Sequence, residues 1–85
     1  MKYKRLGRTG LKVSEICLGG MTFGDEADEK ETERILDVAR DGGINFIDTS
    51  DAYPFSNSTR SETILGPLLK KHRSETILAT KVMRP

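Results

Sequence analysis

The sequence has little of what marks several classes of protein. Its one cysteine, Cys17, excludes an internal disulfide and a multi-thiolate metal site, so we expect no metal and a reducing, cytoplasmic location. No apolar run approaches the roughly 20 residues that a membrane helix needs, and we expect no membrane association. The 14 Lys and Arg nearly cancel the 13 Asp and Glu, which leaves a net charge of +1. A nucleic-acid partner is therefore not expected, because such proteins carry a clear basic excess.

The chain is also poor in apolar residues for a self-sufficient domain. Its 85 residues are 35% hydrophobic. A chain of this length buries only about 60–65% of its unfolded surface. We therefore expect a small core within residues 1–85 and no second domain.

The first part of the chain predicts a β-hairpin followed by a short strand. The hairpin is expected over residues 3–13, because the glycines of the segment 7–10 supply the positive φ that a tight turn needs. The apolar segment 15–18 predicts a strand that ends at Gly19-Gly20. Cys17 lies in this strand, and we expect it to be a small buried core residue.

Two amphipathic helices, each followed by a strand, are expected next. Asp28 can cap the first helix, with Glu31 as its capping-box partner, and Gly42-Gly43 ends it. The second helix is expected from Ser61, as its N-cap, through Lys71, with a kink or a division at Pro67. The strands are expected at residues 44–47 and 76–82.

A hairpin followed by β-α-β-α-β indicates the α/β fold class. Strands that are joined by crossover helices run parallel, with right-handed connections. Ligands of such folds bind at the carboxyl ends of the strands. In this sequence those ends are followed by Gly20, Met21, Asp48, Tyr53 and Lys81.

Tyr53, Lys81 and Asp48 together suit general acid catalysis. A lysine ammonium close to a phenol stabilises the phenolate, and so makes the phenol a better proton donor. A carboxylate next to the lysine keeps the lysine charged and in place. Such a phenol can protonate a carbonyl oxygen as hydride arrives, an effect worth roughly 10²–10⁴ in rate. The same residues also fit a solvated rim with an ordinary ion pair and a tyrosine that packs on the surface.

Sequence motifs are spread over nearly the whole chain, at residues 6–14 (LGRTGLKVS), 18–24 (LGGMTFG), 43–53 (GINFIDTSDAY) and 79–82 (ATKV). In this order and at these separations, they resemble the N-terminal part of the aldo-keto reductase family. The resemblance implies a (β/α)₈ TIM barrel that reduces aldehydes or ketones with NADP(H). The partner would be a small-molecule carbonyl substrate.

The resemblance also implies a role for each residue of the rim. Tyr53 would be the proton donor, Lys81 would make it more acidic, and Asp48 would pair with Lys81 and reach towards the nicotinamide ribose. Gly20 and Met21 fall where the family's first cofactor-contacting segment follows a strand. Gly20 stands where the family usually has threonine, so a hydroxyl contact to the cofactor is missing there.

The family's fourth catalytic residue, a histidine, would lie beyond Pro85. His72 is expected to have only a surface or helix-dipole role. Residues 1–85 are therefore interpreted as a truncated, partial reductase domain that is inactive by itself. One alternative is a non-enzymatic product that self-associates through open sheet edges and a bare inner face carrying Ile47 and Leu78. Another is a cofactor-binding regulatory subunit on the same fold.

Overall fold

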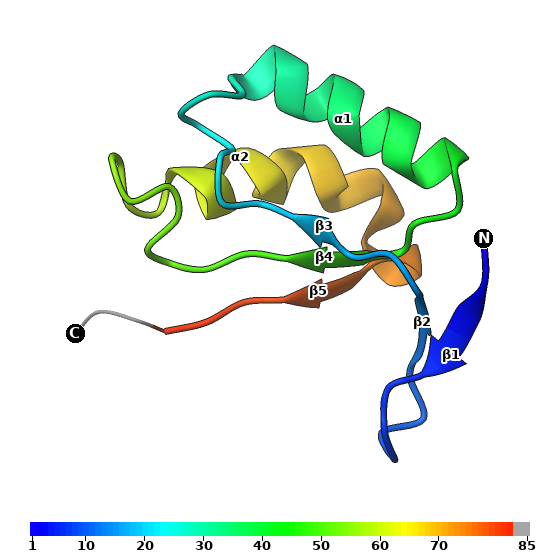
Figure 1. The fold of residues 1–85 in the computed structure, drawn as a ribbon. Coiled ribbons are helices and arrows are strands. Elements are labelled where there is room, and N and C mark those ends of the chain that lie inside the picture. The colour runs from blue at the N-terminus through cyan, green and yellow to red at the C-terminus, as the bar shows by residue number, and fades with distance from the viewer. Residues whose placement is uncertain (83–85) are drawn as a thin grey trace.

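The computed structural model describes residues 1–82, which form a small antiparallel hairpin and a three-stranded parallel sheet with two helices (Figure 1). The hairpin pairs β1 (Tyr3–Arg5) with β2 (Lys12–Ser14), and its turn lies between them as predicted. Figure 1 shows the hairpin at the end of the parallel sheet where the strands begin. It is therefore separated from the carboxyl ends of the strands by the length of the sheet.

The parallel sheet has the order β3 (Leu18–Gly19), β4 (Phe46–Asp48) and β5 (Ile77–Ala79). Each strand is shorter than predicted. The pairing nevertheless continues beyond the strand ends, because Gly20 N donates to the Asp48 carbonyl at 2.8 Å and Thr49 N donates to the Ala79 carbonyl at 2.8 Å. These bonds hold together the segments that leave the carboxyl ends of the strands.

Helix α1 (Glu29–Asp41) begins and ends where the capping residues predict. The Asp28 carboxylate accepts the Glu31 N–H at 2.8 Å. The capping box is not closed in return, since the Glu31 carboxylate pairs with Arg34 instead. At the other end Gly43 has a φ of 91°, a left-handed conformation that glycine adopts without strain.

Helix α2 (Arg60–Leu69) differs from its prediction at both ends. Its N-cap is Thr59, which makes no side-chain capping bond, and Ser61 is a fully buried residue inside the helix. The prediction of Ser61 as N-cap is wrong because its hydroxyl is directed to partners outside the helix. The expected division is present, since the chain continues as the 3₁₀ helix η1 (Lys70–Glu75) after α2 ends, although Pro67 itself lies within α2.

The core lies between the sheet and the two helices, which cover the same face of the sheet in Figure 1. Its buried members come from both helices, from β4 and from the loop before α1, and they are Phe23, Ala27, Leu36, Ile47, Leu65 and Leu69. The prediction of Ile47 and Leu78 on a bare inner face is wrong. Both belong to this core side, Ile47 as a buried member and Leu78 packed against it. Because side chains alternate along a strand, Asp48 lies on the opposite face, which the helices leave open.

Within residues 1–82, neither helix is long and apolar enough to cross a membrane.

Candidate active site

Asp48 and Lys81 meet at the carboxyl ends of neighbouring parallel strands. Asp48 is the last residue of β4, and Lys81 follows β5. The Lys81 Nζ lies 3.1 Å from each carboxylate oxygen of Asp48 and donates to the Thr49 carbonyl at 2.7 Å. The two side chains are 40% and 39% exposed, and an ion pair so exposed contributes little to stability. The pair is accessible to a ligand.

Tyr53 lies beside this pair, in the loop that follows β4. The Lys81 Nζ lies over its ring, 4.6 Å from the ring centroid. The ring of Phe55 packs edge-on against Tyr53, with centroids 5.6 Å apart and an angle of 89° between the planes. The backbone of Tyr53 is fixed as well, since its carbonyl accepts the N–H of Ser61 at 3.0 Å. The structure thus brings together the three residues that the sequence proposed for catalysis.

The surroundings of Lys81 raise its pKa above the usual lysine value. Partial desolvation lowers the pKa, but the interactions with Asp48 and Tyr53 outweigh that effect and raise it. Lys81 is therefore an ammonium group at every physiological pH. That is the form that stabilises a neighbouring phenolate.

Cys17 is exposed, so its prediction as a buried core residue is wrong. The strand β3 includes only Leu18 and Gly19, and Leu18 takes the place against the core. Side-chain alternation directs Cys17 to the helix-free face. Partial burial and the charge of Asp48 raise the pKa of the Cys17 thiol, and Lys81 lowers it by less. A raised pKa keeps the thiol protonated near neutral pH and weakens it as a nucleophile.

Gly20 and Met21 follow β3 and reach the same rim. Gly20 is buried and is bonded through its N–H to the Asp48 carbonyl, while Met21 is 50% exposed. A Cβ atom at Gly20 would lie 3.2 Å from the Ser61 Oγ and 3.3 Å from the Asp48 carbonyl oxygen. The backbone at this position can approach Asp48 so closely because glycine has no side chain. The carboxylate of Asp48 and the side chain of Met21 are the groups here that could contact a bound cofactor.

The sequence did not predict a buried contact between the hydroxyl groups of Ser61 and Thr49. The Ser61 hydroxyl donates to the Gly20 carbonyl at 2.9 Å and lies 2.7 Å from the Thr49 hydroxyl oxygen. Ser61 is 0% exposed and Thr49 is 1% exposed. The sequence holds no local signal for this contact, because the two hydroxyls belong to a helix and a loop that meet only in the folded chain.

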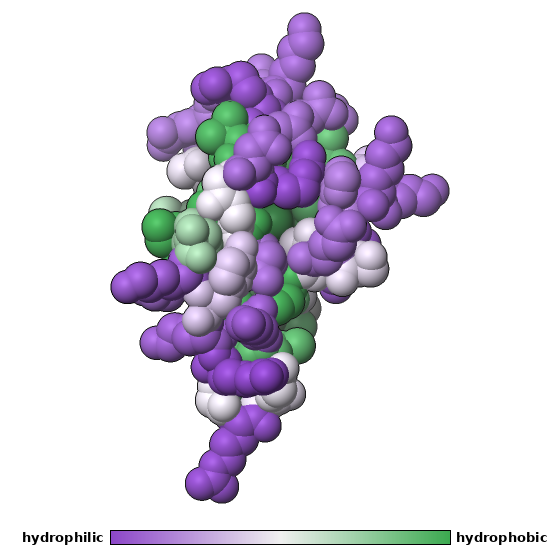
Figure 2. Space-filling model, turned by 90° about the vertical axis from the view of Figure 1, so that its right-hand side faces the viewer, coloured by the Kyte–Doolittle hydropathy of each residue, from purple (hydrophilic) through white to green (hydrophobic). Residues whose placement is uncertain are grey.

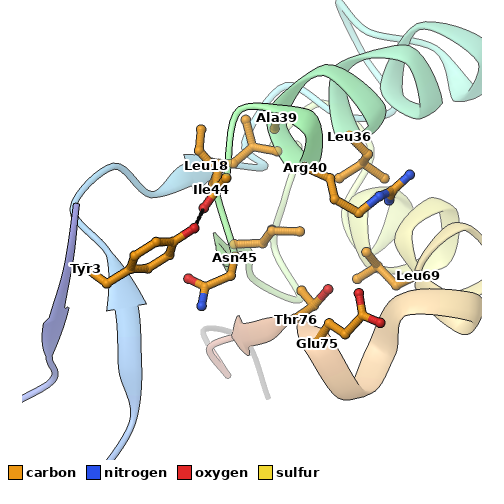
Figure 3. A pocket seen from close by; sticks show the side chains of 12 residues that line it. Tyr3, Leu18, Leu36, Ala39, Arg40, Ile44, Asn45, Leu69, Glu75 and Thr76 are labelled. Carbon is orange, nitrogen blue, oxygen red and sulfur yellow. Dashed lines mark hydrogen bonds between the residues drawn. The ribbon is translucent and has the colours of Figure 1, made fainter. Parts of the chain in front are cut away.

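A separate pocket of about 160 Å³ lies at the other end of the sheet, between the hairpin and the carboxyl end of α1 (Figure 3). The Tyr3 hydroxyl, which donates to the Gly43 carbonyl at 2.6 Å, and the side chains of Arg40 and Glu75 lie around an apolar floor of leucine and isoleucine. Figure 2 shows this end of the molecule, where hydrophilic side chains surround the apolar ones that reach the surface. None of the residues predicted for catalysis lines this pocket.

Among residues 1–82, no three His, Cys, Asp or Glu side chains are grouped as a metal site would require.

Comparison with known proteins gives the family. Residues 15–85 match the model of the Aldo/keto reductase family. The chain belongs to this family. Similar curated proteins include the uncharacterized oxidoreductase YrpG of Bacillus subtilis, 46% identical over 89 residues that cover 100% of this chain and 27% of that protein. A protein named as a probable voltage-gated potassium channel subunit beta of Arabidopsis thaliana is 40% identical over 86 residues, covering 96% of this chain and 25% of its own length.

Solved structures agree with this membership. The aldo-keto reductase AKR11C1 from Bacillus halodurans, in its holo form, superposes with a TM-score of 0.82 at 41% identity, over 96% of this chain and 26% of that one. The predicted fold class, an α/β part of an aldo-keto reductase TIM barrel, is confirmed. The chain spans about a quarter of the length of the curated relatives that it matches.

Proposed function

We propose that the protein reduces a small aldehyde or ketone to the alcohol with NADP(H), and that Tyr53 is the proton donor. The observation that carries this proposal is the grouping of Tyr53, Lys81 and Asp48 at one rim of the sheet in a member of the aldo-keto reductase family. Asp48 and Lys81 are accessible there, so a substrate carbonyl can approach.

The donor set at the rim fits the nicotinamide end of the cofactor. Asp48 offers carboxylate oxygens with lone pairs beyond those directed at Lys81, and these suit ribose hydroxyls. Met21 offers an exposed apolar side chain against which a flat ring can pack. When bound, NADPH supplies the hydride that reduces the carbonyl carbon.

The residues of the chain handle the proton. Tyr53 gives its phenolic proton to the carbonyl oxygen as that oxygen gains negative charge. The phenolate that remains is stabilised by the Lys81 ammonium, whose raised pKa keeps it charged. Asp48 holds the ammonium in place through both carboxylate oxygens. A proton from solvent then restores the phenol.

The proposal is tested by Tyr53→Phe in a form of the protein that extends past Pro85, called the full-length protein below. NADPH oxidation is followed by absorbance with an aromatic aldehyde as substrate. We expect Tyr53→Phe to lower the rate by roughly 10²–10⁴-fold, because the proton donor is lost. Tyr3→Phe is the matched control, since it removes a phenol at the other end of the sheet. A Tyr53→Phe variant that keeps most of the rate contradicts the proposal.

A regulatory subunit that binds the cofactor is the second candidate function. It is favoured by the relatives named as probable voltage-gated potassium channel subunits beta, from Arabidopsis thaliana at 40% identity and Oryza sativa at 38%. The two functions differ in turnover. If the wild-type protein binds NADPH, measured by quenching of its fluorescence, but oxidises it with no aldehyde or ketone of a broad panel, the regulatory function is favoured.

We also propose that residues 1–85 by themselves have no reductase activity and that they self-associate. The helices cover one face of the sheet, and β5 leaves an edge with no neighbouring strand among residues 1–82. Size-exclusion chromatography of the 85-residue chain tests this, because we expect oligomers. A folded monomer that binds NADPH contradicts the proposal.

A cytoplasmic location is proposed on the ground of the single, unpaired cysteine.

A further inference from the structure

We infer that Ser61 is a positioning residue, whose buried hydroxyl couples the Gly20–Met21 segment to the Asp48–Lys81 pair through Thr49. The inference deepens the proposed function and rests on it, because it concerns the same rim. Ser61 is on α2 and points away from solvent, so it cannot act on a substrate itself. Its effect is exerted through the residues that it holds.

The hydrogen bonds of the rim form a closed ring. The Gly20 N–H donates to the Asp48 carbonyl at 2.8 Å, and the Gly20 carbonyl accepts from the Ser61 hydroxyl at 2.9 Å. Ser61 is in turn 2.7 Å from the Thr49 hydroxyl oxygen. The Thr49 carbonyl accepts from the Lys81 ammonium at 2.7 Å, and Lys81 returns to Asp48 at 3.1 Å. The proposed cofactor segment and the proposed catalytic pair are therefore parts of one network.

The directions of the hydroxyl bonds follow from counting hydrogens. Ser61 has one hydroxyl hydrogen, and this hydrogen goes to the Gly20 carbonyl. Thr49 must therefore donate its own hydroxyl hydrogen to the Ser61 oxygen. If Ser61 lost its hydroxyl, a buried donor on Thr49 and a buried acceptor on Gly20 would both lose their partner.

Ser61 also holds Tyr53. Its backbone N–H donates to the Tyr53 carbonyl at 3.0 Å. One residue thus contacts the loop after β3, the loop after β4 and the backbone of the proposed proton donor. Gly20 packs so closely here that an added Cβ would lie 3.2 Å from the Ser61 Oγ. A shift of Ser61 is therefore transmitted to Gly20 and Thr49 through the hydrogen bonds of its hydroxyl.

Ser14 provides a matched control for a purely structural role. It is 2% exposed, and its hydroxyl also makes two hydrogen bonds, donating to the Ile16 carbonyl at 2.7 Å and accepting the Asn45 N–H at 3.2 Å. It lies at the other end of the sheet, as the last residue of the hairpin strand β2. Ser14→Ala and Ser61→Ala therefore remove the same group with similar burial, but only Ser61→Ala disturbs the rim.

The experiment compares Ser61→Ala, Thr49→Val and Ser14→Ala in the full-length protein. The first readout is the KM for NADPH and the kcat of carbonyl reduction. The second is the pKa of Lys81, measured by an NMR titration of its ¹³C-labelled Cε. The resonance is assigned by its loss in Lys81→Arg. This readout needs no catalytic activity. The melting temperature reports how far each variant is destabilised. Thr49→Val is nearly isosteric and serves if Ser61→Ala does not fold.

For Ser61→Ala we expect the KM for NADPH to rise by about fivefold to tenfold, the effect of one lost hydrogen bond. The pKa of Lys81 falls towards its usual value in Ser61→Ala and Thr49→Val, and both readouts stay at the wild-type level in Ser14→Ala. The inference is overturned if Ser61→Ala or Thr49→Val shows the same Lys81 titration as Ser14→Ala. A wild-type protein without reductase activity overturns the proposed function instead, and the Lys81 titration still decides the role of Ser61.

Discussion

The two ends of the parallel sheet are built alike but carry different chemistry. Each has a buried serine that links segments far apart in the sequence, Ser14 at the amino end and Ser61 at the carboxyl end. At the amino end the linked groups are neutral. At the carboxyl end the ring of bonds includes Asp48 and Lys81, which remain accessible to solvent. The same kind of hydrogen bonding thus secures the hairpin at one end and positions charged groups at the other.

Asn45 shows how the amino end is secured. Its side-chain carbonyl accepts the Ser14 N–H at 2.8 Å, and its side-chain amide donates to the Lys12 carbonyl at 3.0 Å. One amide side chain therefore completes the backbone bonding of β2 and connects the hairpin to the residue before β4. Changes at this end should lower stability, and changes at the carboxyl end should lower the rate of reduction.

After Tyr53→Phe, the variant Lys81→Met is expected to have the largest effect on the rate of reduction. The variant keeps an unbranched apolar stem but removes the ammonium that contacts Asp48, Thr49 and Tyr53. We expect kcat for NADPH-dependent reduction to fall by roughly 10²–10³-fold, because the phenolate loses its stabilising charge. Lys4→Met, in the hairpin, is the control. Equal rates for the two variants would remove Lys81 from the mechanism.

A smaller effect, on stability alone, is expected for Asn45→Ala. The loss of its hydrogen bonds to Ser14 and Lys12 should lower the free energy of unfolding by about 1–3 kcal/mol. Urea denaturation measures this difference. The control is Asn57→Ala, whose side chain is exposed in the loop before α2. If Asn45→Ala lowered the rate per folded molecule as well, the two ends of the sheet would not be separate in function.

Asp28→Ala should lower stability by about 1 kcal/mol, since the N-cap bond to the Glu31 N–H is lost. Asp28→Ser retains a capping oxygen and should recover most of the loss in a thermal melt. The cap belongs to neither end network, so the KM for NADPH is expected to be unchanged. No recovery with serine would mean that the carboxylate acts by something other than capping.

The smallest effect is a dependence of stability on alkaline pH. The pKa of Lys81 is raised in the folded protein, so its charge stabilises the fold fully below the usual lysine pKa of about 10.4. That contribution is lost as the pH rises through the folded-state value. Melting temperatures measured across this range should fall less steeply for Lys81→Met than for Lys4→Met. If the melting temperature fell equally with pH in both variants, the charge of Lys81 would not be stabilised by its neighbours.

Local signals in the sequence account for much of the fold. The turn at residues 7–10, the cap at Asp28 and the stop at Gly43 each depend on a few neighbouring residues, and the structure has all of them. Crossover helices imply parallel strands, so the approach of Asp48 to Lys81 could be anticipated as well.

The predictions that are wrong concern residues whose roles depend on tertiary packing. Ser61 has the residue type of an N-cap, but its hydroxyl finds better partners in Gly20 and Thr49. The apolar neighbours of Cys17 favour a core position, but β3 begins only at Leu18, three residues later than predicted. Successive side chains of an extended chain point to opposite faces, so Leu18 packs against the core and its neighbour Cys17 does not.

The most direct test of the division between the two ends measures Tyr53→Phe and Asn45→Ala side by side. Each variant is assayed for its rate of NADPH-dependent aldehyde reduction per folded molecule and for its melting temperature. We predict that Tyr53→Phe loses nearly all of its rate and retains its melting temperature, whereas Asn45→Ala melts earlier and retains its rate. A Tyr53→Phe variant that reduces the aldehyde at close to the wild-type rate would contradict the assignment of the carboxyl-end rim as the active site.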